Sequence, residues 1–225
     1  MTNPSLEENY KAVLQAIEKA AREAERDPGD IDLVAVSKVF DAETIKPLLE
    51  LGHRRFGENR VQEAQGKWPG LRADFDGVEL HLIGPLQTNK SEDAVELFDV
   101  IETLDREKLA NHLAKAMEKI GRRPSLYVQV NTGEEEQKAG IAPSEAVSFA
   151  KWARDDLGLP VIGMMAIPPI DDAPAPHFAL LYELAQEAGL PKLSMGMSGD
   201  YEIAVTLGAT SVRVGSAIFG ARPSH

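Results

Sequence analysis

Short apolar runs alternate with amphipathic segments along most of this chain. The short runs predict buried strands, and the segments whose apolar positions recur at steps of three and four predict helices. The predicted strands are Asp32–Ser37, Arg55–Gly57, Leu80–Ile83, Val100–Glu102, Leu126–Asn131, Val161–Ala166, Leu193–Met197 and Ser211–Val214. The predicted helices between them are Ala42–Gly52, Arg60–Trp68, Glu92–Phe98, Arg106–Gly121, Ser144–Leu157, Phe178–Gly189 and Tyr201–Gly208.

This alternation predicts a parallel sheet, because a crossover between parallel strands has room for a helix. Eight strand–helix units in 225 residues fit a closed (β/α)8 TIM barrel, an α/β fold. The alternative is an open, doubly wound sheet, which would normally carry a Gly-x-Gly-x-x-Gly turn after its first strand. That position holds Ser37-Lys38-Val39-Phe40 instead. We therefore expect a single barrel domain over residues 1–225.

An additional helix precedes the first strand. Ser5 and Glu8 have the spacing of a capping box, and the apolar positions that follow predict an amphipathic helix ending near Asp27-Pro28-Gly29. Residues 1–30 should therefore cover the barrel from outside the repeat. The proline-rich stretch Pro168–Pro174 falls where the loop after the sixth strand belongs, so it predicts a loop and no domain boundary.

Composition narrows the function classes. The net charge of −12 argues against a surface for nucleic acid or anionic membranes. The chain has no cysteine, and its five histidines lack the spacing of metal ligands, so we expect no metal site. The first eight residues lack the basic and apolar regions of a signal peptide, and Val161–Ile170 is too short to span a bilayer. We expect a cytoplasmic protein.

The turns after the last two predicted strands carry small residues. Ser198-Gly199 follows the seventh strand and Gly215-Ser216 follows the eighth. Glycine lets a backbone approach a ligand, and in TIM barrels the loops after these two strands commonly bind phosphate. The alternative is two ordinary tight turns, in which glycine and serine are frequent. Both turns falling at these two strands favours the phosphate site.

Polar side chains share one face of several predicted strands. His81, Gln129, Asn131 and Arg213 each alternate with apolar neighbours, so they should point to the face opposite the helices, into the barrel lumen. A buried arginine without a partner is costly. These groups therefore either form an internal polar network or bind a polar ligand.

Lys38 stands at the carboxyl end of the apolar first strand, where TIM barrels place functional groups. A lysine in a partly desolvated pocket beside a phosphate site suits Schiff-base chemistry with an aldehyde or ketone. The alternatives are a lysine that extends to solvent and one that pairs with a carboxylate such as Glu58. The spacing alone leaves these possibilities open.

Five segments in this order resemble the YggS/PROSC family of pyridoxal-phosphate homeostasis proteins, and the resemblance covers nearly the whole chain. They are Leu33–Lys38, Phe56–Glu63, His81–Lys90, Met195–Asp200 and Val212–Gly215. The resemblance implies the fold of the N-terminal barrel of alanine racemase and pyridoxal 5′-phosphate (PLP) as ligand. The residues it assigns to the PLP site are Lys38, Asn59, His81, Met165, Ser198, Gly199, Arg213, Gly215 and Ser216.

The resemblance also implies roles for these residues. Lys38 carries the aldehyde as an internal aldimine, and the four serines and glycines hold the phosphate. Arg213 approaches the pyridine nitrogen, where it disfavours a protonated ring and weakens the electron sink. Asn59, His81 and Met165 line the pocket. None of these residues is assigned a catalytic role.

The sequence departs from the family pattern at one point. The family usually continues the Ser-Lys pair with Thr-Lys-Pro, whereas this chain has Val39-Phe40-Asp41, which affects the shape of the first loop. Lys138 matches a lysine in the family's loop after the fifth strand. It is either a secondary or transfer site for PLP or a solvated residue among acidic neighbours.

Three functions remain open. The first is a non-catalytic PLP carrier that buffers PLP and passes it to apo PLP-dependent enzymes, as a monomer or weak homodimer. The second is a racemase or decarboxylase of the same fold; these enzymes append a β-domain, which we do not expect here because the sequence ends at His225. Racemisation also needs proton donors on both faces of the carbanion, and only Lys38 is evident. The third is a class I aldolase-like barrel acting on a sugar phosphate. We favour the carrier.

Overall fold

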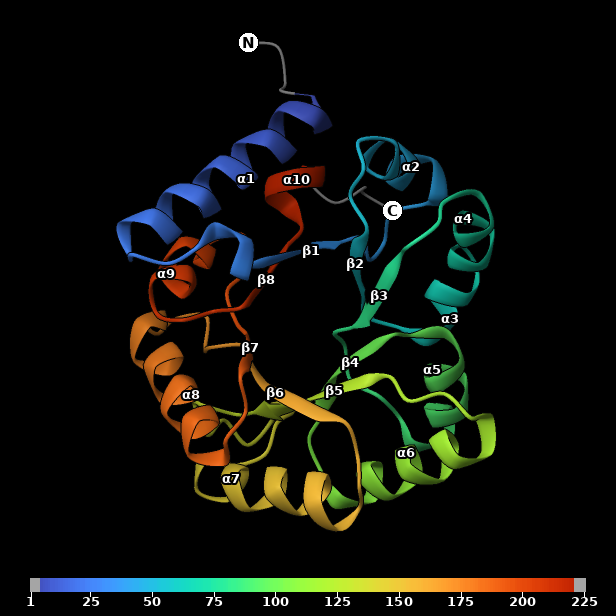
Figure 1. Cartoon of the computed structure of the whole chain (residues 1–225), viewed down its shortest axis with the longest axis vertical. Helices are drawn as coiled ribbons and strands as arrows, with labels where there is room; N and C mark the ends of the chain where they lie inside the picture. The colour runs from blue at the N-terminus through green and yellow to red at the C-terminus, as the bar shows by residue number, and fades with distance from the viewer. Residues whose placement is uncertain (1–4, 221–225) are drawn as a thin grey trace.

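A computed structural model describes residues 5–220 as a closed, eight-stranded barrel in which every strand is parallel to both neighbours. Figure 1 looks into this barrel, with the helices in a ring outside the strands. The strands are β1 (Asp32–Val36), β2 (Arg55–Glu58), β3 (Glu79–Leu82), β4 (Val100–Leu104), β5 (Ser125–Val130), β6 (Val161–Ala166), β7 (Lys192–Ser194) and β8 (Ser211–Val214). The predicted fold class is confirmed.

The helices follow the strands in the expected alternation. They are α1 (Leu6–Glu23), α2 (Ala42–Glu50), α3 (Val61–Gln65), α4 (Trp68–Asp74), α5 (Ser91–Leu97), α6 (Glu107–Ile120), α7 (Pro143–Lys151), α8 (Pro174–Ala188), α9 (Tyr201–Thr206) and α10 (Ser216–Phe219). Short helical turns occur at η1 (Pro28–Asp30), η2 (Thr88–Lys90) and η3 (Trp152–Asp156), the last of which is a π-helical turn that continues α7.

Strand β7 differs most from its prediction. It ends at Ser194, whereas the prediction extended it to Met197. The chain leaves the sheet because Gly196 adopts a φ of +95°, a conformation that an extended strand cannot accommodate. The shortened strand leaves Met197 and Ser198 in a loop at the barrel rim.

Three helix predictions need correction. The single helix predicted over Arg60–Trp68 is two helices, α3 and α4, which Lys67 separates with φ −130° and ψ −38°. Helix α8 begins at Pro174, before the predicted start, because proline suits the first turn of a helix. The four-residue helix α10 was not predicted at all, since it is too short to show a period.

Helix α1 covers the part of the barrel wall that the short α10 leaves open. Its capping box is present: the Ser5 hydroxyl accepts from Glu8 N, and the Glu8 carboxylate accepts from Ser5 N. Its buried face packs against α9 and α10, as Figure 1 shows. That face consists of Val13, Ile17, Ala20 and Ala21.

The core lies mainly between the strands and the helices, where Phe56, Trp68, Phe98 and Phe178 are fully buried. A smaller apolar cluster of Val100, Tyr127 and Met165 is separate from it. Within residues 5–220, no helix has the length and apolar character needed to cross a membrane.

Candidate functional site

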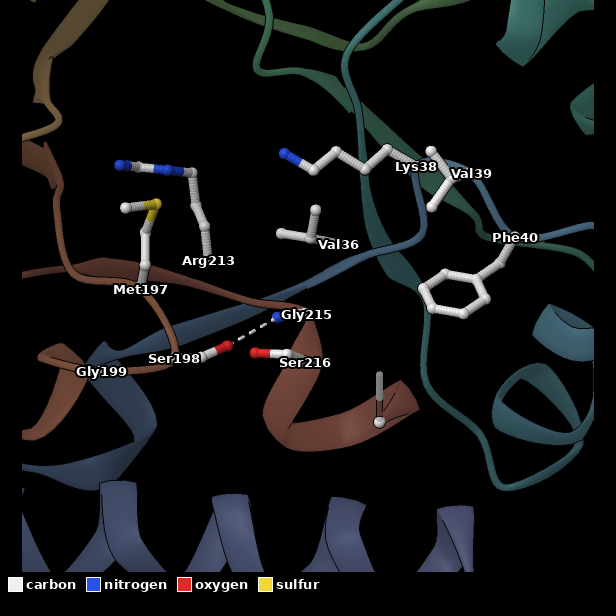
Figure 2. A pocket seen from close by; sticks show the side chains of 11 residues that line it. Val36, Lys38, Val39, Phe40, Met197, Ser198, Gly199, Arg213, Gly215 and Ser216 are labelled. Atoms are coloured by element: carbon white, nitrogen blue, oxygen red, sulfur yellow. Dashed lines mark hydrogen bonds between the residues drawn. The ribbon is translucent and has the colours of Figure 1, made fainter. Parts of the chain in front are cut away.

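Two cavities lie next to each other at the carboxyl ends of the strands. Their volumes are about 280 and 270 Å³, and both are lined by Val36, Lys38, Met197 and Arg213. The loops after β1, β7 and β8 contribute to the first cavity, and the loops after β2, β3, β5 and β6 contribute to the second. Figure 2 shows the first cavity. Lys38 and Arg213 therefore border one continuous recess from two sides.

Backbone amides and two serines form one end of the first cavity. The Ser198 hydroxyl accepts from Gly215 N at 3.2 Å and from Ala217 N at 3.4 Å, so the loop after β7 is joined to the start of α10 (Figure 2). Ser216 is the first residue of α10, and the first amides of a helix have no acceptor within that helix. Gly199 also lines this end. Hydroxyls and amides in this arrangement suit an anion.

Glycine is required at one position that shapes this end. A Cβ on Gly196 would lie 2.5 Å from the Cβ of Ala204 and 2.9 Å from the Cα of Tyr201. With its φ of +95°, Gly196 lets the loop after β7 fold against α9. That close approach places Met197 and Ser198 at the cavity.

Lys38 projects from a tight turn that directly follows β1. The amide of Phe40 donates to the carbonyl of Ser37 at 3.2 Å, which closes the turn. Val39 has a φ of +64°, a left-handed conformation that is unfavourable for a β-branched residue. Figure 2 shows the Lys38 amine extending across the cavity toward Arg213.

Lys67 holds this turn at both ends. Its amine donates to the carbonyls of Ser37 and Phe40, each at 2.9 Å, and lies 2.8 Å from Oε1 of Glu58. The same carboxylate oxygen accepts from the Ser37 hydroxyl at 2.5 Å and from Trp68 Nε1 at 2.9 Å. The carboxylate that the sequence suggested as a partner of Lys38 is thus bonded to Lys67. Sequence reasoning missed Lys67, because it lay inside a segment predicted as a continuous helix.

The loop that departs from the family pattern forms part of the cavity wall. Phe40 lines the first cavity and stacks on Phe219 of α10, with ring centroids 4.8 Å apart and an interplanar angle of 26°. Val39 lines the same cavity with 41% of its surface exposed. Two apolar side chains therefore form this part of the cavity wall.

Arg213 lies in the lumen at the base of the recess and is almost fully buried. Its Nη1 donates to the Ser194 hydroxyl at 2.5 Å, and its Nη2 donates to the carbonyl of Ala166 at 2.9 Å. Oε2 of Glu102 lies 3.7 Å from Nη1. Burial lowers the pKa of Arg213, and the Glu102 carboxylate opposes that effect.

A line of alternating charges continues from Arg213 through the lumen. His81 Nδ1 lies 2.7 Å from Glu102 Oε1, and its Nε2 lies 2.9 Å from Glu79 Oε1. Burial alone would lower the pKa of His81, but its hydrogen bonds to the two carboxylates outweigh burial and raise the pKa to about 9. Burial would likewise raise the pKa of Glu102, but the bond from His81 and the charges of His81 and Arg213 lower it.

The second cavity contains amides and a second lysine. Asn59, Gln129, Asn131 and Lys138 line it. Lys138 pairs with Glu135 at 2.5 Å. The Asn131 side chain donates from Nδ2 to the carbonyl of Glu135 and accepts at Oδ1 from the amide of Glu135. Lys138 thus faces the recess that also contains Lys38.

The structure brings most of the predicted site residues together and separates two of them. Those that line the cavities are Lys38, Asn59, Ser198, Gly199, Arg213, Gly215 and Ser216. His81 and Met165 line neither cavity. His81 belongs to the internal polar network, one of the two possibilities for the lumen residues, and Met165 packs with Val100 and Tyr127. The sequence analysis missed Glu102 in this network, because Thr103 beside it is polar and breaks the alternation with apolar residues.

Comparison with known proteins agrees with this geometry. The family model described as the N-terminal domain of alanine racemase matches residues 9–223 of this chain. A pyridoxal phosphate homeostasis protein of Pseudomonas aeruginosa is 41% identical over 224 residues, which cover 97% of this chain and 96% of that protein. The protein of the same name from Escherichia coli is 37% identical over 227 residues, 95% of each chain. The chain belongs to the family of pyridoxal phosphate homeostasis proteins.

Solved structures place the family within a wider fold. PipY of Synechococcus elongatus, in a structure described as having PLP bound, is 36% identical, with a TM-score of 0.78 over 91% of this chain and 100% of that one. Alanine racemase of Clostridium difficile is 17% identical, with a TM-score of 0.70 over 94% of this chain and 57% of that one. This second likeness shows the fold alone.

Proposed function

We propose that this protein binds PLP covalently at Lys38 and serves to hold and supply it, without turning over a substrate. The observation that carries the proposal is that Lys38, Arg213 and the Ser198–Gly215 pair border a single recess. PLP has an aldehyde, a pyridine nitrogen and a phosphate, and each has a complementary group in this recess. The names of the curated relatives and the PLP-bound structure of PipY support the same ligand.

The phosphate end of the recess fits PLP by the chemistry of its donors. The Ser198 and Ser216 hydroxyls can each donate a hydrogen bond, Gly199 and Gly215 add no side chain, and no carboxylate lines the first cavity. A phosphate is therefore favoured at this end. Lys38 then lies within the same cavity, where its amine can attack the aldehyde carbon.

Arg213 is the group of the recess that would face the pyridine nitrogen of PLP. A guanidinium has five N–H donors and no acceptor, so a ring nitrogen beside it must accept a hydrogen bond. The ring nitrogen of PLP bound here would be unprotonated. An unprotonated ring is a weaker electron sink for chemistry at an amino-acid α-carbon. Arg213 thus favours storage over catalysis.

The lining of the recess is also poor in groups that transfer protons. Among the described residues that line either cavity, the side chains that could act as acids or bases are those of Lys38 and Lys138, and no Asp, Glu, His or Tyr is present. Racemisation requires a proton donor on each face of the substrate. Lys138 faces the same recess while it is paired with Glu135.

The aldehyde of free PLP reacts with amines throughout a cell, so a protein that holds it reversibly limits this damage. We propose that the chain acts in the cytoplasm and hands PLP to apo PLP-dependent enzymes. Its net charge of −12 makes nucleic acid an unfavourable partner.

The test is the absorption spectrum of the purified protein with PLP, before and after borohydride reduction, followed by peptide mapping. We expect a visible band that reduction removes and a stoichiometric label on Lys38. Lys38→Ala should lose the band and keep its fold, whereas Lys151→Ala, a change at an exposed lysine on α7, should match the wild type. A stoichiometric label on Lys38→Ala would overturn the proposal, and rapid turnover of amino acids would replace storage with catalysis.

A further inference from the structure

The guanidinium of Arg213 is tethered by two residues that line neither cavity. Nη1 and Nη2 donate to Ser194 and to the carbonyl of Ala166. The Ser194 hydroxyl, which accepts from Arg213, donates in turn to Oε2 of Glu102 at 2.5 Å. The Ser194 hydroxyl can only accept from the guanidinium, because it donates its single hydrogen to Glu102.

Glu102 is itself fixed by its partners. It is fully buried, with Oε1 bonded to His81 and Oε2 bonded to Ser194. A buried carboxylate is costly unless it is paired and hydrogen-bonded, so any movement that breaks these bonds is penalised. Because Glu102 holds Ser194 and Ser194 bonds to Arg213, the position of Glu102 fixes the position of the Arg213 guanidinium.

We propose that Glu102 is a positioning residue that acts through Ser194 to hold Arg213 against the ring of bound PLP. This inference rests on the function proposed above. Glu102 lines neither cavity, so its action passes through Arg213 and the field of its charge. Arg213 is then held in place at the recess before the ligand arrives, which lowers the cost of binding.

The other end of this line of charges reaches the opposite face of the barrel. His81 bonds to Glu79, whose side chain is 41% exposed and lies 3.2 Å from Arg55 Nε. Asp32, the first residue of β1, also pairs with Arg55, at 3.3 Å. The protonated imidazole of His81 thus lies between two carboxylates and fixes the orientation of Glu102. The line crosses the lumen from β3 and β4 to β7 and β8.

The test compares Glu102→Gln and Ser194→Ala with the wild type after loading with PLP. Glu102→Gln keeps the shape of the side chain and removes its charge, whereas Ser194→Ala removes the link and leaves every charge in place. Thr103→Val is the matched control, since Thr103 is the buried neighbour of Glu102 on β4 and takes no part in the network. The readouts are the release rate of PLP and the pH at which its visible band titrates.

We expect both variants to keep the borohydride label on Lys38. The release of PLP should be about tenfold faster, the effect of losing one hydrogen bond to a charged group. In Glu102→Gln the band should also titrate at a pH lower by about half a unit or more, because a negative charge near the protonated adduct is gone. The other charged groups that line the recess, Lys38, Lys138 and Arg213, are the same in all these proteins.

A readout without ligand separates positioning from general damage to the fold. In ligand-free protein, NMR of the His81 ring should show loss of its proton at a lower pH in Glu102→Gln and no such change in Thr103→Val. If Glu102→Gln and Ser194→Ala release PLP at the wild-type rate with an unchanged titration, the inference is overturned while the PLP site stands. If the wild type itself lacks a label on Lys38, the proposed function fails first. Should Glu102→Gln not fold, Ser194→Ala decides the outcome.

Discussion

The amine of Lys67 lies 2.8 Å from Oε1 of Glu58, and both side chains are shielded from solvent, with 10% and 0% of their surfaces exposed. The pair joins the end of β2 to the turn that carries Lys38, because Lys67 also donates to the carbonyls at both ends of that turn. A buried ion pair of this kind is weak evidence for stability but a strong constraint on geometry. The amine of Lys38, proposed above to react with PLP, is therefore positioned by a second lysine that does not line either cavity.

Replacing Lys67 should uncouple this turn from the barrel. Lys67→Met leaves the Glu58 carboxylate buried without its cation, so we expect a loss of about 3–5 kcal/mol in the free energy of unfolding, measured with urea. The labelling of Lys38 by PLP and borohydride should also slow down. Lys115→Met, at an exposed position on α6, is the control and should change neither quantity. Equal free energies of unfolding for the two variants would show that the contacts of Lys67 contribute nothing to stability.

The left-handed turn residue Val39 offers a test in the stabilising direction. Its φ of +64° is costly for a β-branched side chain and is tolerated by asparagine. We expect Val39→Asn to raise the free energy of unfolding by about 0.5–1 kcal/mol. Val39→Thr keeps the β-branch and the strain, so it should show no such gain. A destabilised Val39→Asn, measured in the same urea titration, would mean that the apolar side chain matters more than the backbone.

Gly196 should resist substitution, unlike a glycine in an exposed helix. Gly196→Ala places a methyl 2.5 Å from the Cβ of Ala204 at a φ of +95°, so we expect a loss of about 2–4 kcal/mol and weaker binding of PLP. Gly70, in α4, has no atom within 4 Å of an added Cβ, and Gly70→Ala should be neutral or stabilising. Thermal melting with and without PLP measures both effects.

His81 should make stability depend on alkaline pH. Its pKa in the folded protein is about 9, above the value of 6.5 for an ordinary histidine. The folded state therefore binds the extra proton between these values, so the contribution of His81 is complete below pH 6.5 and is lost as the pH rises through 9. The free energy of unfolding should fall by about 3 kcal/mol across this window.

His81→Gln should remove most of that dependence, since glutamine does not titrate. The buried phenol of Tyr127 does not interfere, because burial raises its pKa above the ordinary value. Urea unfolding of both proteins at intervals across the window measures the difference. An equally steep decline in His81→Gln would assign the effect to other groups.

Much of the site could be predicted from local sequence. Lys38, Ser198, Gly199, Gly215 and Ser216 each stand at the carboxyl end of a strand, and parallel strands bring these ends to one face. The alternation of polar and apolar residues likewise placed Arg213 in the lumen. These predictions needed only the period of a strand and the direction of the chain.

His81 and Lys67 show where that approach stops. The alternation predicted correctly that His81 points inward, but it does not determine the depth at which a side chain lies in the lumen, and His81 lies below the recess with the carboxylates of Glu79 and Glu102. Lys67 is separated from the turn it holds by about thirty residues, and no periodicity marks it. Contacts between side chains on different strands depend on the closure of the barrel.

The sequence by itself determined the order of strands and helices, the covering helix α1 and the small residues at the last two strand ends, because each depends on neighbours within a few positions of the chain. Tertiary structure alone decided which buried charges pair. Glu58 pairs with Lys67 and Glu102 with His81, since desolvated charges must find partners wherever closure of the barrel places them.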